Sequence, residues 1–516
     1  MKEKFYITTA IAYATNIPHI GNVYEAVLAD AIARFKRLDG YDVLFQTGTD
    51  EHGQKIADIA SSLNVTPKAH VDYISEEIKR IYQSLDVSYD RFVRTTDQNH
   101  QQLVERIFKK LFDQGDIYLG KYSGWYSISE EAFIFDKELI EKGIGEAGDK
   151  LVWMEEETYF FNLAKYQERL LKHIKDNPNF IMPESRKNEM LNNFLSAPLH
   201  DLSVTRTTLK WGIPTFDPKH VIYVWIDALT NYISSFNLDD NFTSLEFLKY
   251  WPADIHLIGK DILRFHTIYW PILLMALEMP LPKTVFGHPW ILIDKLKMSK
   301  SVGNTMYVDE LLKHFSKDTI RYYVLHEIPY AQDGNMTYEL IIERNNGDLA
   351  NTLGNLVNRT LGMIKKYNNG VVYKTLTKGV YEVNLKEETI SLLDKIRSKM
   401  NEYKVSDALE EIMKVLRLAN KFIDLTEPWN LNKNENKEEL HGVLYELIET
   451  IRITATLLRP FLPETANHIF NQLNIEVNNF EQTTTFGLYP DNHKPNDAYV
   501  LFERFDLNKK LEEILK

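Results

Sequence analysis

Two short segments carry residues whose types and spacing suit a nucleotide. Pro18-His19-Ile20-Gly21-Asn22 lies between a β-branched, aromatic stretch and a segment with apolar residues at helical spacing. A helix that begins directly after a strand presents free N–H groups and a positive dipole end, which favour phosphates. Gly21 would let a triphosphate approach, and His19 could donate to a phosphate oxygen. Taken alone the pattern is weak, because a histidine in a chance turn is the commoner explanation.

The second segment is Lys297-Met298-Ser299-Lys300-Ser301. Two lysines among small residues would form a cationic loop that closes over a triphosphate and stabilises charge developing at phosphorus. An ordinary polar surface loop is the alternative for this segment by itself. The two segments gain weight together, because one follows the first predicted strand and the other follows the later ones.

The elements around these segments predict the fold class. Residues 5–13 and 42–47 read as strands and 22–38 as a helix, which gives a parallel, right-handed β-α-β unit. The β/α pattern stops at about 118, where short aromatic strands suggest an antiparallel insert, and resumes with strands at 221–226, 254–259 and 284–287. From about 348 onward helical patterns dominate. We predict an α/β doubly wound parallel sheet, split by a small antiparallel insert and followed by an all-α helix bundle.

Composition excludes several classes of protein. The 516 residues contain no cysteine, so disulfides and thiolate metal sites are impossible. The longest apolar stretch is too short for a membrane span of about 20 residues, and the N-terminus reads as a strand, so we expect a cytoplasmic protein. The net charge of −13 argues mildly against a nucleic-acid partner, but a local basic track is compatible with it.

The string KMSKS, at this distance from an HIGH-like element, resembles the signature pair of class I aminoacyl-tRNA synthetases, with Asn22 in place of the last histidine. Four further strings resemble the methionyl-tRNA synthetases of that class, and the likeness runs from about residue 5 to 475. These strings are Ala10 to Tyr13, Gly48 to Gly53, Val224 to Ala228, and Gly259 through His266.

This resemblance implies a Rossmann-like catalytic domain in two halves. The expected boundaries are 1–117 and 221–300 for the halves, 118–220 for the connective insert, 301–350 for a linking stem-contact region, and 351–516 for a helical anticodon-binding domain. The implied reaction joins methionine and ATP into methionyl-adenylate and transfers methionine to tRNA(Met), initiator tRNA included. ATP would bind with Mg²⁺, and a monomer is expected.

The resemblance also implies roles for individual residues. Catalysis is assigned to His19, Lys297 and Lys300. ATP binding is assigned to these three and to Gly21, Asn22, Gly259 and Asp261. Methionine binding is assigned to Asp50, for the ammonium group, and to Ile11, Tyr13, Trp225, Ala228, Tyr232, Ile262 and His266, for the side chain. Anticodon binding is assigned to Asn355, Arg359 and Trp429.

Plainer explanations exist for several of these residues. Without the resemblance, Trp225 and Ile262 would be assigned to the core, and Trp429 would be a packing residue beside a helix pair. Asp50-Glu51-His52 could pass for a metal site, but adjacent residues on a strand point to opposite faces. Many relatives carry C-x-x-C zinc knuckles in the insert, whereas this one has no cysteine, so no zinc is predicted and aromatic packing should hold it. The candidates for that packing are Trp125, Tyr126, Phe133, Phe135 and Trp153.

Other enzymes fit less well. A cysteine-specific sister enzyme would need zinc thiolates, and the branched-chain enzymes usually carry a larger editing insert. A small-molecule nucleotidyltransferase would not need the helical domain. A non-catalytic tRNA-binding relative would not need His19, Lys297 and Lys300.

Overall fold

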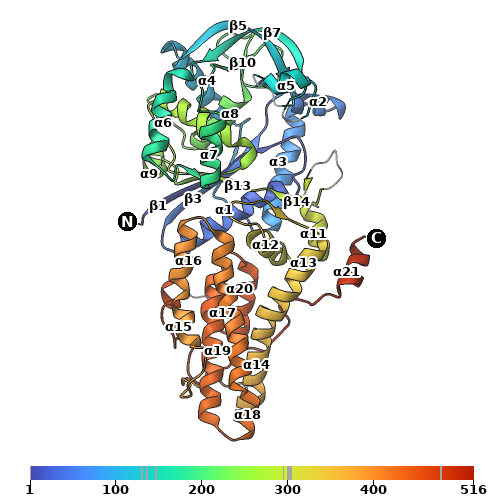
Figure 1. Ribbon diagram of the computed structural model, residues 1–516, viewed down its shortest axis with the longest axis vertical. Coiled ribbons are helices and arrows are strands. Elements are labelled where there is room, and N and C mark those ends of the chain that lie inside the picture. The colour runs from blue at the N-terminus through green and yellow to red at the C-terminus, as the bar shows by residue number, and fades with distance from the viewer. Residues whose placement is uncertain are drawn as a thin grey trace.

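A computed structural model describes residues 2–129, 132–134, 137–145, 148–293, 296–298, 305–476 and 479–515. A β/α portion carries an antiparallel layer at one end, and a bundle of long helices extends from the other end (Figure 1). The predicted fold class is therefore confirmed.

The central sheet has seven strands, and every pairing in it is parallel. Its strands are β1 (Lys4–Thr9), β2 (Ala12–Tyr13), β3 (Asp42–Asp50), β4 (Arg91–Arg94), β8 (Ile181–Met182), β12 (Ile255–Gly259) and β13 (Val285–His288). The chain leaves β1 for β3 on one side and returns much later to β12 on the other. In such sheets a ligand crevice opens at the carboxyl ends of the strands where the order reverses, here between β1 and β12.

Helices cover this sheet and connect its strands. They are α1 (Ile20–Leu38), α2 (Gln54–Ser62), α3 (Pro67–Ser84), α4 (Gln98–Asp113), α8 (Val224–Ser234), α9 (Leu245–Tyr250), α10 (Trp270–Ala276), α11 (Val308–His314) and α12 (Lys317–His326). A small sheet of β14 (Ile291–Ile293), β15 (Leu296–Lys297) and β16 (Gly334–Asn335) adjoins them.

The insert is built on one long antiparallel pair. Its elements are β5 (Ile117–Ser127), β6 (Ala132–Phe133), α5 (Lys137–Lys142), β7 (Val152–Phe161), α6 (Gln167–Asp176), α7 (Glu184–Asn193), β9 (Leu202–Ser203), β10 (Thr205–Arg206) and β11 (Val221–Ile222). The rings of Trp125 and Trp153 meet edge to face across β5 and β7 at 5.5 Å. This is the kind of aromatic contact expected without metal, although Phe135 lies outside the described residues. β8 leaves the insert region and joins the edge of the main sheet through β13.

One predicted strand is wrong. Residues 221–226 were expected to form a strand of the parallel sheet, but the strand here is only Val221–Ile222, and it pairs antiparallel with β10. Helix α8 begins at Val224. The error has a physical cause, because a short apolar run is equally compatible with a buried strand and with the first turns of a buried helix.

The C-terminal portion is helical. α13 (Tyr338–Arg344), a π-helical stretch (Asn345–Gly354) and α14 (Asn355–Asn368) follow one another without a break. The remaining helices are α15 (Leu385–Ile390), α16 (Leu392–Asn401), α17 (Val405–Thr426), α18 (Pro428–Lys433), α19 (Lys437–Leu458), α20 (Pro463–Leu473) and α21 (Leu507–Ile514). α18 lies at the end of the bundle farthest from the sheet (Figure 1). None of the described helices is both long and apolar enough to cross a membrane.

A buried arginine of the β/α portion also bonds to the helical portion. Arg321 of α12 and Asp30 of α1 are both fully buried, and Nη2 of the arginine lies 2.8 Å from Oδ2 of the aspartate. The other guanidinium N–H groups donate to the backbone carbonyls of Leu85, Pro460 and Phe461. The guanidinium group therefore holds together α1, the end of α3 and the turn that precedes α20.

We predict that Arg321→Met lowers the free energy of unfolding by about 3–5 kcal/mol, because it takes from the buried Asp30 carboxylate its fully buried partner, leaving only the partly exposed Arg34, and removes the donors of three backbone carbonyls. Urea unfolding measures the change. Arg37→Met is the control, since Arg37 and its partner Asp90 are both partly exposed and such pairs contribute about 1 kcal/mol or less. Equal effects of the two substitutions would contradict the role given to the buried pair.

Candidate active site

The two predicted nucleotide motifs meet at the start of α1. His19 is the residue that precedes the helix, and Gly21 lies in its first turn. A Cβ added at Gly21 would lie 3.1 Å from the His19 ring and 3.7 Å from Sδ of Met298. The backbone N–H of Ile20 donates to the carbonyl of Met306 at 2.9 Å, so the chain beyond Lys297 is fastened to the same helix start. Asn22 is exposed there, whereas Lys300 lies outside the described residues.

The opposite wall of the crevice comes from the end of β12. Gly259 is buried and Asp261 is exposed. Nζ of Lys297 lies 3.4 Å from Oδ2 of Asp261 and 3.9 Å from the centre of the Trp290 ring. Nζ of Lys260 lies 4.1 Å from the centre of the same ring. The Trp290 ring thus contacts two lysines, and nothing in the sequence predicted these contacts.

A buried pair beside this wall was also missed. Nε2 of His288 lies 2.9 Å from Oε2 of Glu25 on α1, and its Nδ1 donates to the Pro289 carbonyl at 2.8 Å. Burial raises the pKa of the Glu25 carboxyl. Burial opposes protonation of His288, but the hydrogen bond to Glu25 makes the net pKa change of the imidazole a rise. Glu25 follows Gly21 by one helical turn, and that spacing was the signal available in the sequence.

A neutral polar pair lies among the residues assigned to the methionine side chain. Nδ1 of His266 donates to the Ile262 carbonyl at 2.9 Å, which leaves Nε2 to accept from the Tyr232 hydroxyl at 2.7 Å. Burial lowers the pKa of His266 to about 4, so the ring is neutral at physiological pH. Tyr232 and Ala228 are buried on α8, and the Trp225 ring lies 6.3 Å from that of His266.

The remaining residues of this group lie near the ends of β1 and β3. Tyr13 of β2 pairs with Asp50, the last residue of β3. A Cβ added at Gly48 would lie 3.0 Å from Cγ2 of Ile11. Trp225 stacks on Phe265 with ring centres 3.6 Å apart, and this partner was not predicted. The structure therefore brings Asp50 and Tyr13 together in one place and Trp225, Tyr232, Ile262 and His266 together in another.

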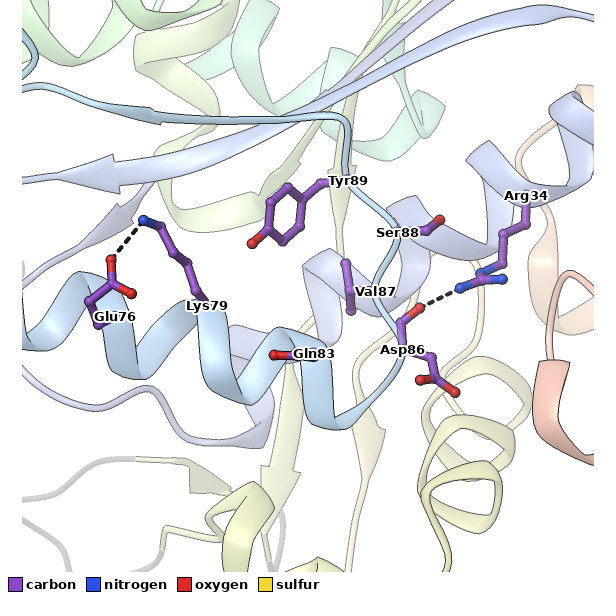
Figure 2. A pocket seen from close by; sticks show the side chains of 8 residues that line it. All are labelled: Arg34, Glu76, Lys79, Gln83, Asp86, Val87, Ser88 and Tyr89. Carbon is purple, nitrogen blue, oxygen red and sulfur yellow. Dashed lines mark hydrogen bonds and ion pairs between the residues drawn. The ribbon is translucent and has the colours of Figure 1, made fainter.

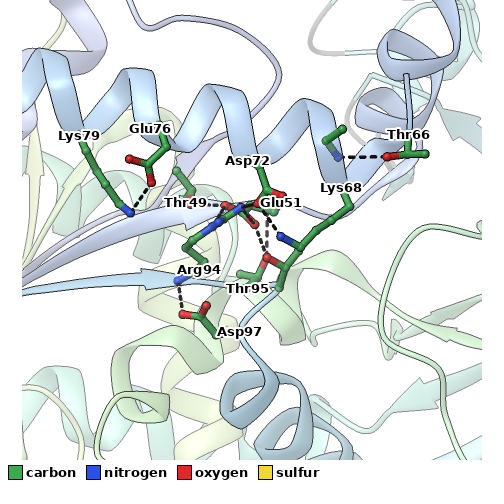
Figure 3. A network of polar contacts seen from close by, with 12 residues as sticks. Thr49, Glu51, Thr66, Lys68, Asp72, Glu76, Lys79, Arg94, Thr95 and Asp97 are labelled. Atoms are coloured by element: carbon green, nitrogen blue, oxygen red, sulfur yellow. Dashed lines mark hydrogen bonds and ion pairs between the residues drawn. The ribbon is translucent and has the colours of Figure 1, made fainter. Parts of the chain in front are cut away.

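Glu51 and His52 do not form a metal site with Asp50. The sequence had suggested that strand alternation would point these side chains to opposite faces. That argument does not apply here, because β3 ends at Asp50. Instead, Glu51 accepts from Arg94 Nε at 2.7 Å (Figure 3). Nδ1 of His52 lies 2.6 Å from Oδ2 of Asp227. Within the described part of the chain, no group of three or more His, Asp or Glu side chains could hold a metal ion.

The predicted anticodon residues lie on the helical portion. Asn355 is exposed, and Arg359, one turn later on α14, donates to Asp424 of α17 at 3.2 Å. The Trp429 residue of α18 is 41% exposed, which is far more than a core tryptophan would be.

A shallow hollow of about 540 Å³ lies elsewhere, between α1, α3 and the segment before β4 (Figure 2). Arg34 there donates to the backbone carbonyl of Asp86, and Lys79 pairs with Glu76. Its cations are thus already engaged with other groups of the chain.

Comparison with known proteins agrees with this geometry. Residues 5–143 and 137–361 match a family described as tRNA synthetases class I (M), and residues 384–516 match the anticodon-binding domain of tRNA ligases. The methionine–tRNA ligase of Clostridium acetobutylicum is 50% identical across the whole chain, which spans 80% of that relative. The ligase of Bacillus subtilis is 46% identical over 99% of the chain and 79% of its own length.

A solved structure of Mycobacterium tuberculosis methionyl-tRNA synthetase in complex with methionyl-adenylate superposes with a TM-score of 0.91. It is 40% identical and covers 97% of this chain and 100% of that one. The free-state structure of the same enzyme gives 0.85 at 37% identity, over 98% and 99%. The chain therefore belongs to the methionyl-tRNA synthetases, the methionine–tRNA ligases of the class I aminoacyl-tRNA synthetases.

Proposed function

We propose that this crevice activates L-methionine with Mg-ATP and that the chain, as a cytoplasmic monomer, transfers the methionyl group to tRNA(Met), initiator tRNA included. The methionine carboxylate attacks the α-phosphate and releases pyrophosphate. The terminal adenosine hydroxyl of the tRNA then attacks the adenylate carbonyl, forms the ester and releases AMP as the acyl–phosphate bond breaks. Neither step needs a protein nucleophile, so the protein contributes position and charge stabilisation.

ATP would lie across the start of α1. His19, Gly21 and Asn22 would face its phosphates. Gly259 and Asp261 would lie beside the ribose, whose hydroxyls can donate hydrogen bonds to the Asp261 carboxylate. Lys297 and Lys300, together with Mg²⁺, would neutralise the charge that develops on the phosphates. The position of Met298 supports this arrangement, because its Sδ would lie 3.7 Å from a Cβ added at Gly21.

The observation that carries the choice of amino acid is the neutral Tyr232–His266 pair. Tyr232 lies on α8, the helix whose Asp227 contacts His52, two residues after Asp50. A neutral, partly aromatic pocket suits an uncharged, polarizable thioether. The Asp50 carboxylate would bind the ammonium group. We propose no zinc site, since a chain without cysteine offers no thiolate ligands.

We predict that Asp50→Ala abolishes methionine-dependent ATP–pyrophosphate exchange, because the ammonium group loses its counter-charge. The melting temperature should change little. Asp240→Ala is the control, as its carboxylate is fully exposed and exchange should be normal. An unaltered KM for methionine in Asp50→Ala would remove the residue from the site.

Lys297 should act mainly in the transition state. Lys297→Ala should lower the rate of adenylate formation by roughly 10²–10³, as loss of one charge-stabilising donor does, with a smaller change in ATP affinity. Rapid-quench kinetics separate the two effects. Lys313→Ala, in an exposed pair with Glu310, is the control. A normal rate with lost ATP affinity would reduce Lys297 to a binding residue.

Trp429 should read the anticodon. Stacking of one base on an aromatic ring contributes about 1–3 kcal/mol, so Trp429→Ala should cut tRNA charging roughly ten- to hundredfold. Exchange and melting temperature should stay near those of the wild type, because the residue is largely exposed. The assay compares transcripts with CAU and altered anticodons. Equal charging of both by the unaltered enzyme would refute the anticodon role.

A further inference from the structure

Two residues beyond Asp50, a histidine is held by groups that the reaction does not use. His52 is 4% exposed, and its Nδ1 lies 2.6 Å from Oδ2 of Asp227. The Trp211 ring meets it edge on, with ring centres 5.4 Å apart. The backbone N–H of the next residue, Gly53, donates to the Trp211 carbonyl at 3.1 Å. The orientation of the His52 ring is therefore set by its contacts with Asp227 and Trp211.

Asp227 joins three elements through one carboxylate. It lies on α8, is 1% exposed, and its Oδ1 accepts from Nε2 of His100 on α4 at 2.7 Å. His100 is held in turn by its Nδ1, 2.9 Å from Ser234 Oγ. Burial opposes ionisation of Asp227, but the two imidazoles outweigh it and lower the pKa of the carboxyl. The carboxylate is thus charged and accepts one N–H from each ring.

The same helix carries the proposed side-chain pocket. Trp225 and Ala228 flank Asp227 on α8, and Tyr232 follows little more than one turn later. Asp50 lies two residues before His52. The His52–Asp227 hydrogen bond is therefore a short connection between the strand end that would bind the ammonium group and the helix that would bind the thioether.

The other side of this segment is held as firmly. Glu51 is fully buried and accepts from Arg94 Nε and Nη2, at 2.7 and 3.0 Å, and from Thr49 Oγ1 at 2.6 Å. Arg94 also reaches Asp72 of α3 at 2.5 Å (Figure 3). The backbone after Asp50 is fixed against β4 and α3 on one side, so His52 decides its position relative to α8 on the other.

We propose that His52, through Asp227, is a positioning residue that sets the distance between the Asp50 carboxylate and the side-chain pocket on α8, and so selects the length of the amino-acid side chain. The proposal rests on the methionine-binding role proposed for Asp50. An ammonium anchor and a side-chain pocket on separate elements act as a length gauge only if their separation is fixed. A displacement of about 1 Å at such a site can cost as much as a hundredfold in rate.

The two histidines on Asp227 allow a matched test. A glutamine amide stands where Nε2 of histidine stands, and an asparagine amide where Nδ1 stands. His52→Gln and His100→Asn each lose the hydrogen bond to Asp227, whereas His52→Asn keeps a donor at the Nδ1 position. All three are compared in ATP–pyrophosphate exchange with methionine, the shorter S-methylcysteine and the longer ethionine, alongside melting temperature.

We expect His52→Gln and His100→Asn to melt at similarly lowered temperatures. Only His52→Gln should raise the KM for methionine, by roughly tenfold or more, and narrow its preference over S-methylcysteine and ethionine, with the KM for ATP unchanged. His52→Asn should keep the wild-type KM for methionine and the wild-type preference over the two analogues. If His52→Gln does not fold, a wild-type KM and preference in His52→Asn support the proposal and a raised KM overturns it.

Parallel changes in His52→Gln and His100→Asn, or an unaltered preference in His52→Gln, would overturn the positioning role. These outcomes are distinguishable from failure of the proposed function. If Asp50→Ala binds methionine normally, the ammonium assignment fails. If Asp50→Ala loses methionine while the two histidine variants behave alike, only the positioning role fails.

Discussion

The buried contact between Asp30 and Arg321 is the interaction on which the rest of this enzyme depends. An enzyme that activates an amino acid in one domain and reads a tRNA with another must hold the two at a fixed separation. Here one guanidinium group, with no exposure to water, ties α1 of the catalytic portion to the turn before α20. Burying such a pair has a large desolvation cost, but removing one of its partners from the folded protein is strongly destabilising. The same helix, α1, begins at the proposed nucleotide site, so the buried arginine contact and that site share one helix.

The parts of the fold that could be predicted are those where local pattern and tertiary environment agree. Residues 22–38 have apolar residues at helical spacing and lie within α1, and residues 42–47 lie within β3. The stretch 5–13 was predicted as one strand but is interrupted between β1 and β2. The failure at 221–226 arises because α8 is buried and its first turns are apolar. An apolar run without polar residues has no periodicity that distinguishes a strand from a helix.

The site divides in the same way. The resemblance supplied Tyr232, His266, Gly21 and Lys297. In the structure Tyr232 bonds to His266, Met298 lies beside the Gly21 turn, and Lys297 lies 3.4 Å from Asp261. The roles themselves remain proposals. The sequence could not predict contacts between residues that are distant along the chain. Examples are the contacts of Trp290 with two lysines and of Asp227 with two histidines. No spacing rule connects residues 52, 100 and 227, since only the folded sheet brings them together.

The central claim is that the crevice between β1 and β12 accepts methionine and ATP together. ATP–pyrophosphate exchange by the purified chain, run separately with each of the standard amino acids and without tRNA, tests it most directly. We expect exchange that depends on methionine and on Mg²⁺ and is negligible with the other amino acids. Exchange supported equally by leucine, isoleucine or valine, or no exchange with methionine in a folded preparation, would contradict it.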